Sequence, residues 1–340
     1  MQRIKRIIAF FIPELLIVLI SKLDPQNLCF KNFFWNFTFY LKKNSYEEKI
    51  KFKSKIKFGI VVQGPVIEKD DFTYEALKDL QDSYPNNEIV LSTWNDQNKE
   101  KINKIKELGI YVIENNYPKS GMENINYQIY STLSGIRYLK KLKVNYVMKL
   151  RTDQKICKKN VDIFLFNLIK TFTVIDSENI QKERIIGINM NTIKYKPFSF
   201  SDLFQFGNIE DMEKMWDIPL TTELFTFNDR KKLNCSVEEM EKFPNSEMYI
   251  YMNFLKKIGF KFEYNLKSYY KSLKERTIII DKNTIDLYWF KYHILDYEKY
   301  RILEEKIDFL DWLNIYTDFE NLDFKELNKI EKKVFKMKLY

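Results

Sequence analysis

The residues of clearest chemical interest lie in the stretch 145–153, which reads NYVMKLRTD. Its first part is mostly apolar, and Arg151, Thr152 and Asp153 follow at once. This pattern predicts a buried parallel strand that ends in polar groups, and parallel strands present ligand-binding residues at their carboxyl ends. A carboxylate at this place can hold a metal-bound phosphate, or it can simply cap the next turn.

Polar side chains also follow two other runs that predict strands. Gln63 and Gly64 come after the apolar run 58–62, and a further group follows the run that begins at Glu88. The members of that group are Ser92, Thr93, Trp94 and Asn95. Because the carboxyl ends of parallel strands meet at one edge of a sheet, we expect these groups to lie together. They suit the base and ribose of a nucleotide, although each alone is more often a solvated or capping residue.

A predicted helix over 124–141 adds a row of polar side chains. Asn124, Gln128 and Ser131 stand at spacings of four and three, beside an apolar face. Residues at these spacings share one side of a helix. An inward-facing amide row suits the hydroxyl groups of a sugar or a nucleotide.

The usual nucleotide-binding loops are missing from the sequence. The first predicted strand is followed by Gln-Gly-Pro-Val, and Pro65 has no amide N–H to offer a pyrophosphate. No GxxxxGK[ST] stretch occurs either. Binding of NAD or ATP in the common modes is therefore not expected, and a nucleotide would be held by side chains and strand-end loops.

The order of the predicted elements indicates an α/β fold. Short apolar runs alternate with helical patterns from residue 58 onward, which favours a mostly parallel, Rossmann-like sheet flanked by helices. Thr73 and Ser246 are predicted to cap helices, and Gly259 is predicted to end the second of these. We expect an amphipathic arm and aromatic linker over 1–57, a main domain over 58–295 and a helical appendage over 296–340.

Composition narrows the partners and the compartment. The chain has 340 residues, is 45% hydrophobic and carries a formal net charge of +9. This charge suits anionic partners such as nucleotide diphosphates or acidic lipid headgroups, and no nucleic-acid motif is recognisable. The cysteines, which are Cys29, Cys157 and Cys235, are too widely spaced to indicate a disulfide framework or a cysteine zinc site, so a reducing cytoplasm is expected.

The amino terminus combines basic residues with the apolar run 7–20, which contains Pro13 and Glu14. As a helix this run would reach about 21 Å, whereas a hydrocarbon core is about 30 Å thick. It is therefore expected either to lie in the cytoplasmic membrane interface or to pack on the main domain.

Several of these stretches resemble the WavE lipopolysaccharide-synthesis family. The motifs that carry the resemblance are VVQGPV, EIVLSTWN, ENINYQIYSTLSGI and YVMKLRTD, followed by FSDLFQFG at 200–207 and NSEMY at 245–249. The resemblance implies a GT-A type glycosyltransferase that uses a nucleotide-sugar donor. Its product would be a lipopolysaccharide or lipooligosaccharide core, or a related bacterial surface glycan.

The resemblance also implies roles for individual residues. Asp153 corresponds to the acid that binds a divalent metal, Mn²⁺ or Mg²⁺, and His293, the only histidine, falls where some GT-A enzymes have a further metal ligand. The usual two acids, D-x-D, are represented here by Arg151 and Asp153, so metal dependence stays open and Arg151 can contact the diphosphate itself. Glu247 corresponds to the base that deprotonates the acceptor, unless it only complements the helix dipole, and Asp202 corresponds to a donor or acceptor ligand.

These observations together predict a hexosyltransferase-like enzyme on the cytoplasmic face of the bacterial inner membrane. Its partners would be a nucleotide-diphosphate sugar, a glycolipid or oligosaccharide acceptor and the membrane surface. Two alternatives remain at this stage. One is a non-catalytic glycan- or membrane-binding protein with a degenerate transferase fold, and the other is a Rossmann-like methyltransferase.

Overall fold

The computed structural model describes residues 57–174, 180–223, 234–291, 305–332 and 334–336. The predicted amino-terminal arm and His293 lie outside these residues. Among the helices that are described, none has both the length and the apolar character needed to cross a lipid bilayer.

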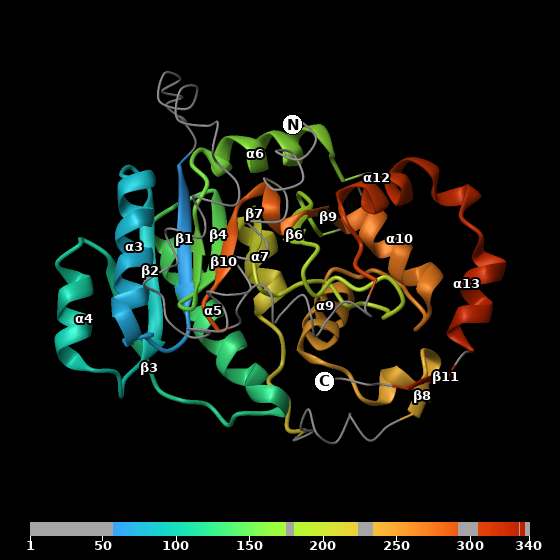
Figure 1. Cartoon of the computed structure of the whole chain (residues 1–340), viewed down its shortest axis with the longest axis horizontal. Helices are drawn as coiled ribbons and strands as arrows, with labels where there is room; N and C mark the ends of the chain where they lie inside the picture. Colours follow the sequence, from blue (N-terminus) through green and yellow to red (C-terminus); the bar gives the residue numbers. More distant parts are fainter. Residues whose placement is uncertain (1–56, 175–179, 224–233, 292–304, 333, 337–340) are drawn as a thin grey trace, which may run out of the picture.

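A seven-stranded sheet organises the molecule (Figure 1). Its order is β3-β2-β1-β4-β7-β6-β9, and β7 runs against both of its neighbours. Because β4 and β6 are each antiparallel to β7, they run in the same direction, and the carboxyl ends of every strand except β7 share one edge. The strands are β1 Phe58–Gln63, β2 Glu88–Trp94, β3 Tyr111–Asn115, β4 Tyr146–Arg151, β6 Ile185–Ile188, β7 Gln205–Asn208 and β9 Thr277–Ile280. The predicted α/β fold with a mostly parallel sheet is confirmed.

Helix α5 (Ile125–Lys141) packs unusually close to β1. A Cβ atom on Gly135 would lie 2.6 Å from Val61 Cγ1, and one on Gly59 would lie 2.5 Å from Leu139 Cδ1. The two glycines therefore allow helix and strand to approach within the space that one side chain would fill. On the same face of β1, Ser131 Oγ donates a hydrogen bond to Gln63 Oε1 at 2.9 Å.

The opposite face of the sheet is covered by other helices. Phe58 makes an edge contact with Tyr84, at the end of α3, and Tyr146 makes one with Phe166 in α6. The sheet thus lies between two helical layers, which accounts for the continuous apolar character of its central strands. The helices not yet bounded are α3 Phe72–Ser83, α4 Lys99–Lys106, α6 Val161–Thr171, α7 Ile209–Trp216, α9 Ser246–Lys257, α10 Leu266–Arg276, α12 Phe309–Asp318 and α13 Phe324–Glu331.

Two short antiparallel pairs of strands accompany the main sheet. Strand β5 (Gln154–Ile156) follows β4 and pairs with β10 (Leu287–Trp289), and β8 (Asn234–Ser236) pairs with β11 (Val334–Lys336). The first pair matters for the candidate site, because it carries a segment from far along the chain to the end of β4.

Two helix caps differ from the sequence-based predictions. Helix α9 is capped by Asn245, whose side chain accepts a hydrogen bond from Met248 N at 3.1 Å, and not by Ser246. Helix α3 begins at Phe72, one residue before the predicted cap Thr73. The Thr73 hydroxyl instead accepts from Ile67 N at 2.8 Å and donates to Thr152 O at 3.0 Å, so it ties α3 to the end of β4. Gly259, with φ +74°, follows the end of α9 as predicted.

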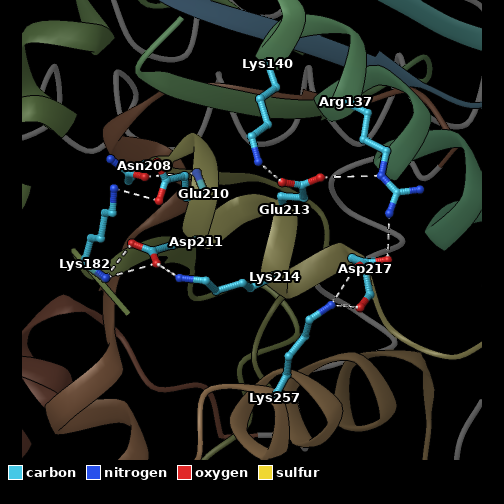
Figure 2. A network of polar contacts seen from close by, with 10 residues as sticks. All are labelled: Arg137, Lys140, Lys182, Asn208, Glu210, Asp211, Glu213, Lys214, Asp217 and Lys257. Carbon is cyan, nitrogen blue, oxygen red and sulfur yellow. Dashed lines mark hydrogen bonds and ion pairs between the residues drawn. The ribbon is translucent and has the colours of Figure 1, made fainter. Parts of the chain in front are cut away.

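Polar contacts fix α7 to the elements around it (Figure 2). Glu213 pairs with Lys140 of α5 at 2.5 Å, and Asp217, just after α7, pairs with Lys257 of α9 at 2.6 Å. The buried Asp211 carboxylate accepts hydrogen bonds from the backbone N–H groups of Lys182 and Glu183, at 2.9 to 3.0 Å. Asp211 therefore holds the segment that leads into β6.

We predict that Asp211→Ala lowers the free energy of unfolding by about 2 kcal/mol, because the backbone N–H groups of Lys182 and Glu183 lose a charged and fully buried acceptor. The matched control is Glu213→Ala on the same helix. The partners of Glu213 are half exposed, so this substitution should lower the free energy of unfolding by only about 0.5 kcal/mol. Urea unfolding of the two variants measures the difference. Equal losses would contradict the role given to Asp211.

Candidate functional site

Arg151 and Asp153 form a two-point ion pair at the end of β4. Arg151 Nε lies 2.9 Å from Asp153 Oδ1, and Nη2 lies 3.0 Å from Oδ2. The Asp153 side chain is 8% exposed, whereas that of Arg151 is 25% exposed. A ligand that approaches this edge therefore meets the guanidinium first and the carboxylate behind it.

Asp153 is enclosed further by strand β10. Trp289 Nε1 donates to Asp153 Oδ2 at 2.9 Å, and Phe290 N donates to the Asp153 backbone oxygen at 2.8 Å. Burial alone would raise the pKa of Asp153, but the charge and hydrogen bonds of Arg151, with Trp289 and Lys291, outweigh it and hold the pKa below its ordinary value. Asp153 is accordingly a carboxylate at neutral pH.

The turn after β1 is built against the same residues. Gln63 stands in register with both Ser92 and Arg151, and Gln63 O accepts from Thr152 N at 3.0 Å. Gly64 has φ +123°, and a Cβ atom there would lie 2.8 Å from Thr152 Oγ1. Glycine is thus required both by the backbone angle and by the closeness of the two loops. The expected meeting of these strand ends is confirmed.

The polar residues that end β2 are largely engaged within the protein. Asn115 Nδ2 donates to Ser92 Oγ and to Thr93 O, each at 2.9 Å. Trp94 is 2% exposed because Tyr117 stacks on it at 4.3 Å between ring centroids, while Tyr117 itself is 43% exposed. The aromatic face open to a ligand at this corner therefore belongs to Tyr117. Asn95 is exposed beside it.

A buried charged group lies under the site on the α5 side. Lys149 is 0% exposed, its Nζ donates to the backbone oxygen of Asp202, and it lies 4.8 Å from the centroid of the Trp216 ring. Burial lowers the pKa of Lys149 to about 7, against the opposing effect of Asp202. Gln128 Nε2 donates to Asp202 Oδ2 at 2.7 Å, which links helix α5 to this group.

The remaining predicted residues fall in two places. Glu247 is 8% exposed near the start of α9, and its Oε1 accepts from Asn191 Nδ2 at 2.6 Å. Asn124 is exposed before the first turn of α5, so it does not extend the inward row formed by Gln128 and Ser131.

The donor set at this edge does not fit a divalent metal. Both oxygens of Asp153 accept hydrogen bonds from nitrogen donors, and the second acid of a D-x-D pair is replaced by Arg151. Across the residues that the structure describes, no three His, Cys, Asp or Glu side chains gather as metal ligands. Hard cations take several oxygen ligands, so no chemical step is assigned to a metal here.

A surface groove of about 570 Å³ lies elsewhere, between β3 and α5. It is lined by residues such as Tyr130 and Arg137, and none of the candidate site residues lines it.

Sequence reasoning missed Trp289, Tyr117, Lys149 and Asn191. Lys149 did leave a signal, because a lysine inside an apolar strand pattern needs a buried partner. Trp289 left none, since it stands 136 residues from Asp153 and only the pairing of β5 with β10 brings it there.

Lys149→Met offers a test of the buried ammonium. The pKa of Lys149 is about 7 in the folded protein and ordinarily 10.5, so the unfolded chain binds more protons between these values and folding stability rises with pH. Relative to Lys149→Met, the wild-type free energy of unfolding should rise by up to about 1.4 kcal/mol per pH unit above pH 7. Urea unfolding at pH 7, 8 and 9 measures this difference. Parallel pH dependences would show that the ammonium does not titrate in this window.

Residues 58–331 match the model of a family described as WavE lipopolysaccharide synthesis. No curated protein matches. Among solved structures, the chain is similar to a glycosyltransferase involved in the glycosylation of the major capsid of PBCV-1, with 10% identity, a TM-score of 0.33 and coverage of 66% of this chain and 81% of that one. It is also similar to S. aureus TarS, with 13% identity, a TM-score of 0.34 and coverage of 59% and 34%. Likenesses this distant carry no argument, whereas the family match spans most of the chain.

Proposed function

Because the chain belongs to the WavE lipopolysaccharide synthesis family, we propose that it is a glycosyltransferase. In this proposal it moves a hexosyl group from a nucleotide-diphosphate sugar to a lipopolysaccharide or lipooligosaccharide core, or to a related surface glycan. The family match supports the transferase, and the arrangement of charges at the end of β4 supports the donor class.

The observation that carries the proposal is the partly exposed Arg151 guanidinium, held from behind by Asp153. Guanidinium groups bind phosphate oxygens in a planar, two-point geometry. Lys291, which is exposed, adds positive charge beside the same carboxylate. A diphosphate at this edge would therefore meet fixed positive charge at the carboxyl end of a central parallel strand, where such sheets bind ligands.

The nucleoside is assigned to the neighbouring strand ends. Asn95 and Tyr117 are the exposed residues at the corner beyond β2, and Tyr117 can stack on a base. Gln63, Gly64, Ser92, Thr93 and Trp94 form the wall behind them. Gln128 and Asp202 lie on the α5 side, where the sugar would extend.

Glu247 is assigned as the base in the transfer step. The acceptor hydroxyl gives its proton to the Glu247 carboxylate while its oxygen forms a bond to the anomeric carbon of the donor. The bond between that carbon and the diphosphate oxygen breaks, and the electron pair leaves with the diphosphate toward Arg151. Stabilisation of this developing charge by preorganised donors is expected to supply the largest part of the rate.

The acceptor is proposed to be a glycolipid or oligosaccharide presented at the inner face of the bacterial inner membrane. The basic and apolar sequence of residues 1–20 supports peripheral attachment there.

A second candidate is a non-catalytic protein that binds glycans or membranes. It is favoured by one observation, the replacement of an acid by Arg151 in the D-x-D position. This candidate predicts that nucleotide-diphosphate sugars do not bind.

Arg151→Met tests the donor site. We expect transfer to fall by about 10²-fold or more, since the leaving diphosphate loses its charged donor. The matched control is Lys155→Met, because Lys155, on the neighbouring strand β5, is also 25% exposed but pairs with Asp79 of helix α3. A panel of UDP-, GDP-, dTDP- and ADP-sugars is screened by thermal shift with EDTA, and then with Mn²⁺ or Mg²⁺. A donor at one hundred times its Kd stabilises the wild type by about 2.7 kcal/mol.

Three outcomes of the thermal-shift screen are informative. A shift in EDTA that Arg151→Met removes and Lys155→Met keeps supports the assignment. A shift seen only with metal would overturn Arg151 as the main diphosphate contact, and the absence of any shift would favour the non-catalytic candidate. Full transfer activity in Asp153→Asn would also contradict the proposed donor site, because the orientation of Arg151 would then not depend on the Asp153 carboxylate.

A further inference from the structure

Asn191 stands out as a buried polar residue in a left-handed backbone conformation. It has φ +69° and is 6% exposed, and its Nδ2 donates to Glu247 Oε1 at 2.6 Å. Asparagine tolerates this conformation better than other non-glycine residues, and such conformations concentrate where a side chain must be aimed. Nothing in the family motifs singles out this residue.

The loop around Asn191 is fastened from several sides. Ser199 Oγ donates to Asn191 O at 2.7 Å, and Thr192 Oγ1 donates to Ile188 O at 2.7 Å. Ser201 N donates to Thr192 Oγ1 at 3.2 Å, so the two ends of the loop are tied together. The backbone from which the Asn191 side chain projects is therefore held by buried hydrogen bonds.

This loop belongs to the edge of the sheet that carries Arg151 and Asp153. It leaves the carboxyl end of β6, which runs in the same direction as β4, and it also contains Asp202. Glu247 reaches Asn191 from the first turn of α9, where Asn245 occupies the cap. Asn191 thus joins a helix start to the ligand-binding edge of the sheet.

We propose that Asn191 is a positioning residue that orients the Glu247 carboxylate and favours its charged form. An N–H donor bonded to one carboxylate oxygen fixes the rotation of the group and stabilises the carboxylate against protonation. The proposal rests on the proposed function, in which Glu247 accepts the proton of the acceptor hydroxyl.

Two substitutions separate orientation from simple support of the fold. Asn191→Gly keeps the left-handed backbone without strain and removes the side chain with its amide. Asn191→Asp keeps the size of the side chain but sets a second carboxylate against Glu247. Two carboxylates at this distance repel each other when both are charged, so the second of the pair's two pKa values rises. Both groups are then deprotonated only at higher pH.

The matched control is Asn189→Asp in the same loop. Asn189 Nδ2 donates to Asp281 Oδ1 at 2.8 Å, so this variant makes the same change in charge against a different carboxylate. Glu123, which accepts from Ser246 Oγ at 3.4 Å near the start of α9, is unchanged in every variant. Differences between the variants therefore report on position 191.

The experiment measures release of nucleoside diphosphate by the full chain, from the panel donor that gives the largest thermal shift, between pH 5 and 9. For Asn191→Asp we expect the acid limb of kcat/KM to move to higher pH by about one unit or more, because activity requires the deprotonated base. Asn191→Gly should lower kcat about tenfold or more with little change in KM. Asn189→Asp should leave the acid limb in place.

An unshifted acid limb in Asn191→Asp would overturn the inference, as would an equal shift in Asn189→Asp. Glu247→Gln separates this failure from that of the proposed function. If Glu247→Gln loses activity while Asn191→Asp behaves as wild type, only the role of Asn191 is wrong. If Glu247→Gln remains fully active, or if the wild type releases no nucleoside diphosphate from any donor, the assignment of the base fails and the role of Asn191 fails with it.

Discussion

The pairing of Arg151 with Asp153 is the constraint around which this edge of the molecule is arranged. A carboxylate that is 8% exposed is costly to keep charged unless every oxygen finds a donor. Arg151 supplies two of these donors and Trp289 supplies the third. The pairing of β5 with β10 brings a distant part of the chain, with Trp289, to the end of the central strand, where the Asp153 carboxylate needs this donor.

Buried polar groups with partners also occur on the α5 side of the sheet. Gly59 and Gly135 let the helix approach β1 so closely that Ser131 reaches Gln63, and polar groups can then be buried there with partners. Lys149 is the extreme case, because its ammonium is enclosed near Trp216 and the backbone of Asp202. Burial of such groups gives less stability than apolar residues would have given. A loss of folding stability of this kind is expected at a functional site.

Much of the sheet could be predicted from sequence because its signals are local. The apolar runs of β1, β2 and β4 and the polar residues after them are each read within a few positions, and the parallel arrangement follows from the helices between them. Strands β7, β9 and β10 were not predicted, and neither was the contact of Trp289 with Asp153, since these depend on pairings between distant segments. The predictions that Thr73 and Ser246 cap helices were wrong, each for its own reason. Asn245, next to Ser246, has an equally suitable side chain and caps α9, whereas the Thr73 hydroxyl donates a hydrogen bond to the backbone oxygen of Thr152.

The electrostatic arrangement also indicates which groups should set the pH response of the site. Because Arg151 holds the pKa of Asp153 below its ordinary value, the ion pair stays intact through the neutral range and the guanidinium keeps one orientation. Lys149 has a pKa of about 7, so its charge does change in that range, and it acts on the site from beneath the edge through its charge interactions with Asp202, Arg151 and Asp153. Glu247 and Asn191 stand on a different element, at the start of α9 and the end of β6. Binding of an anionic donor and deprotonation of an acceptor are thus assigned to groups that are held separately, so the two steps can respond to pH independently.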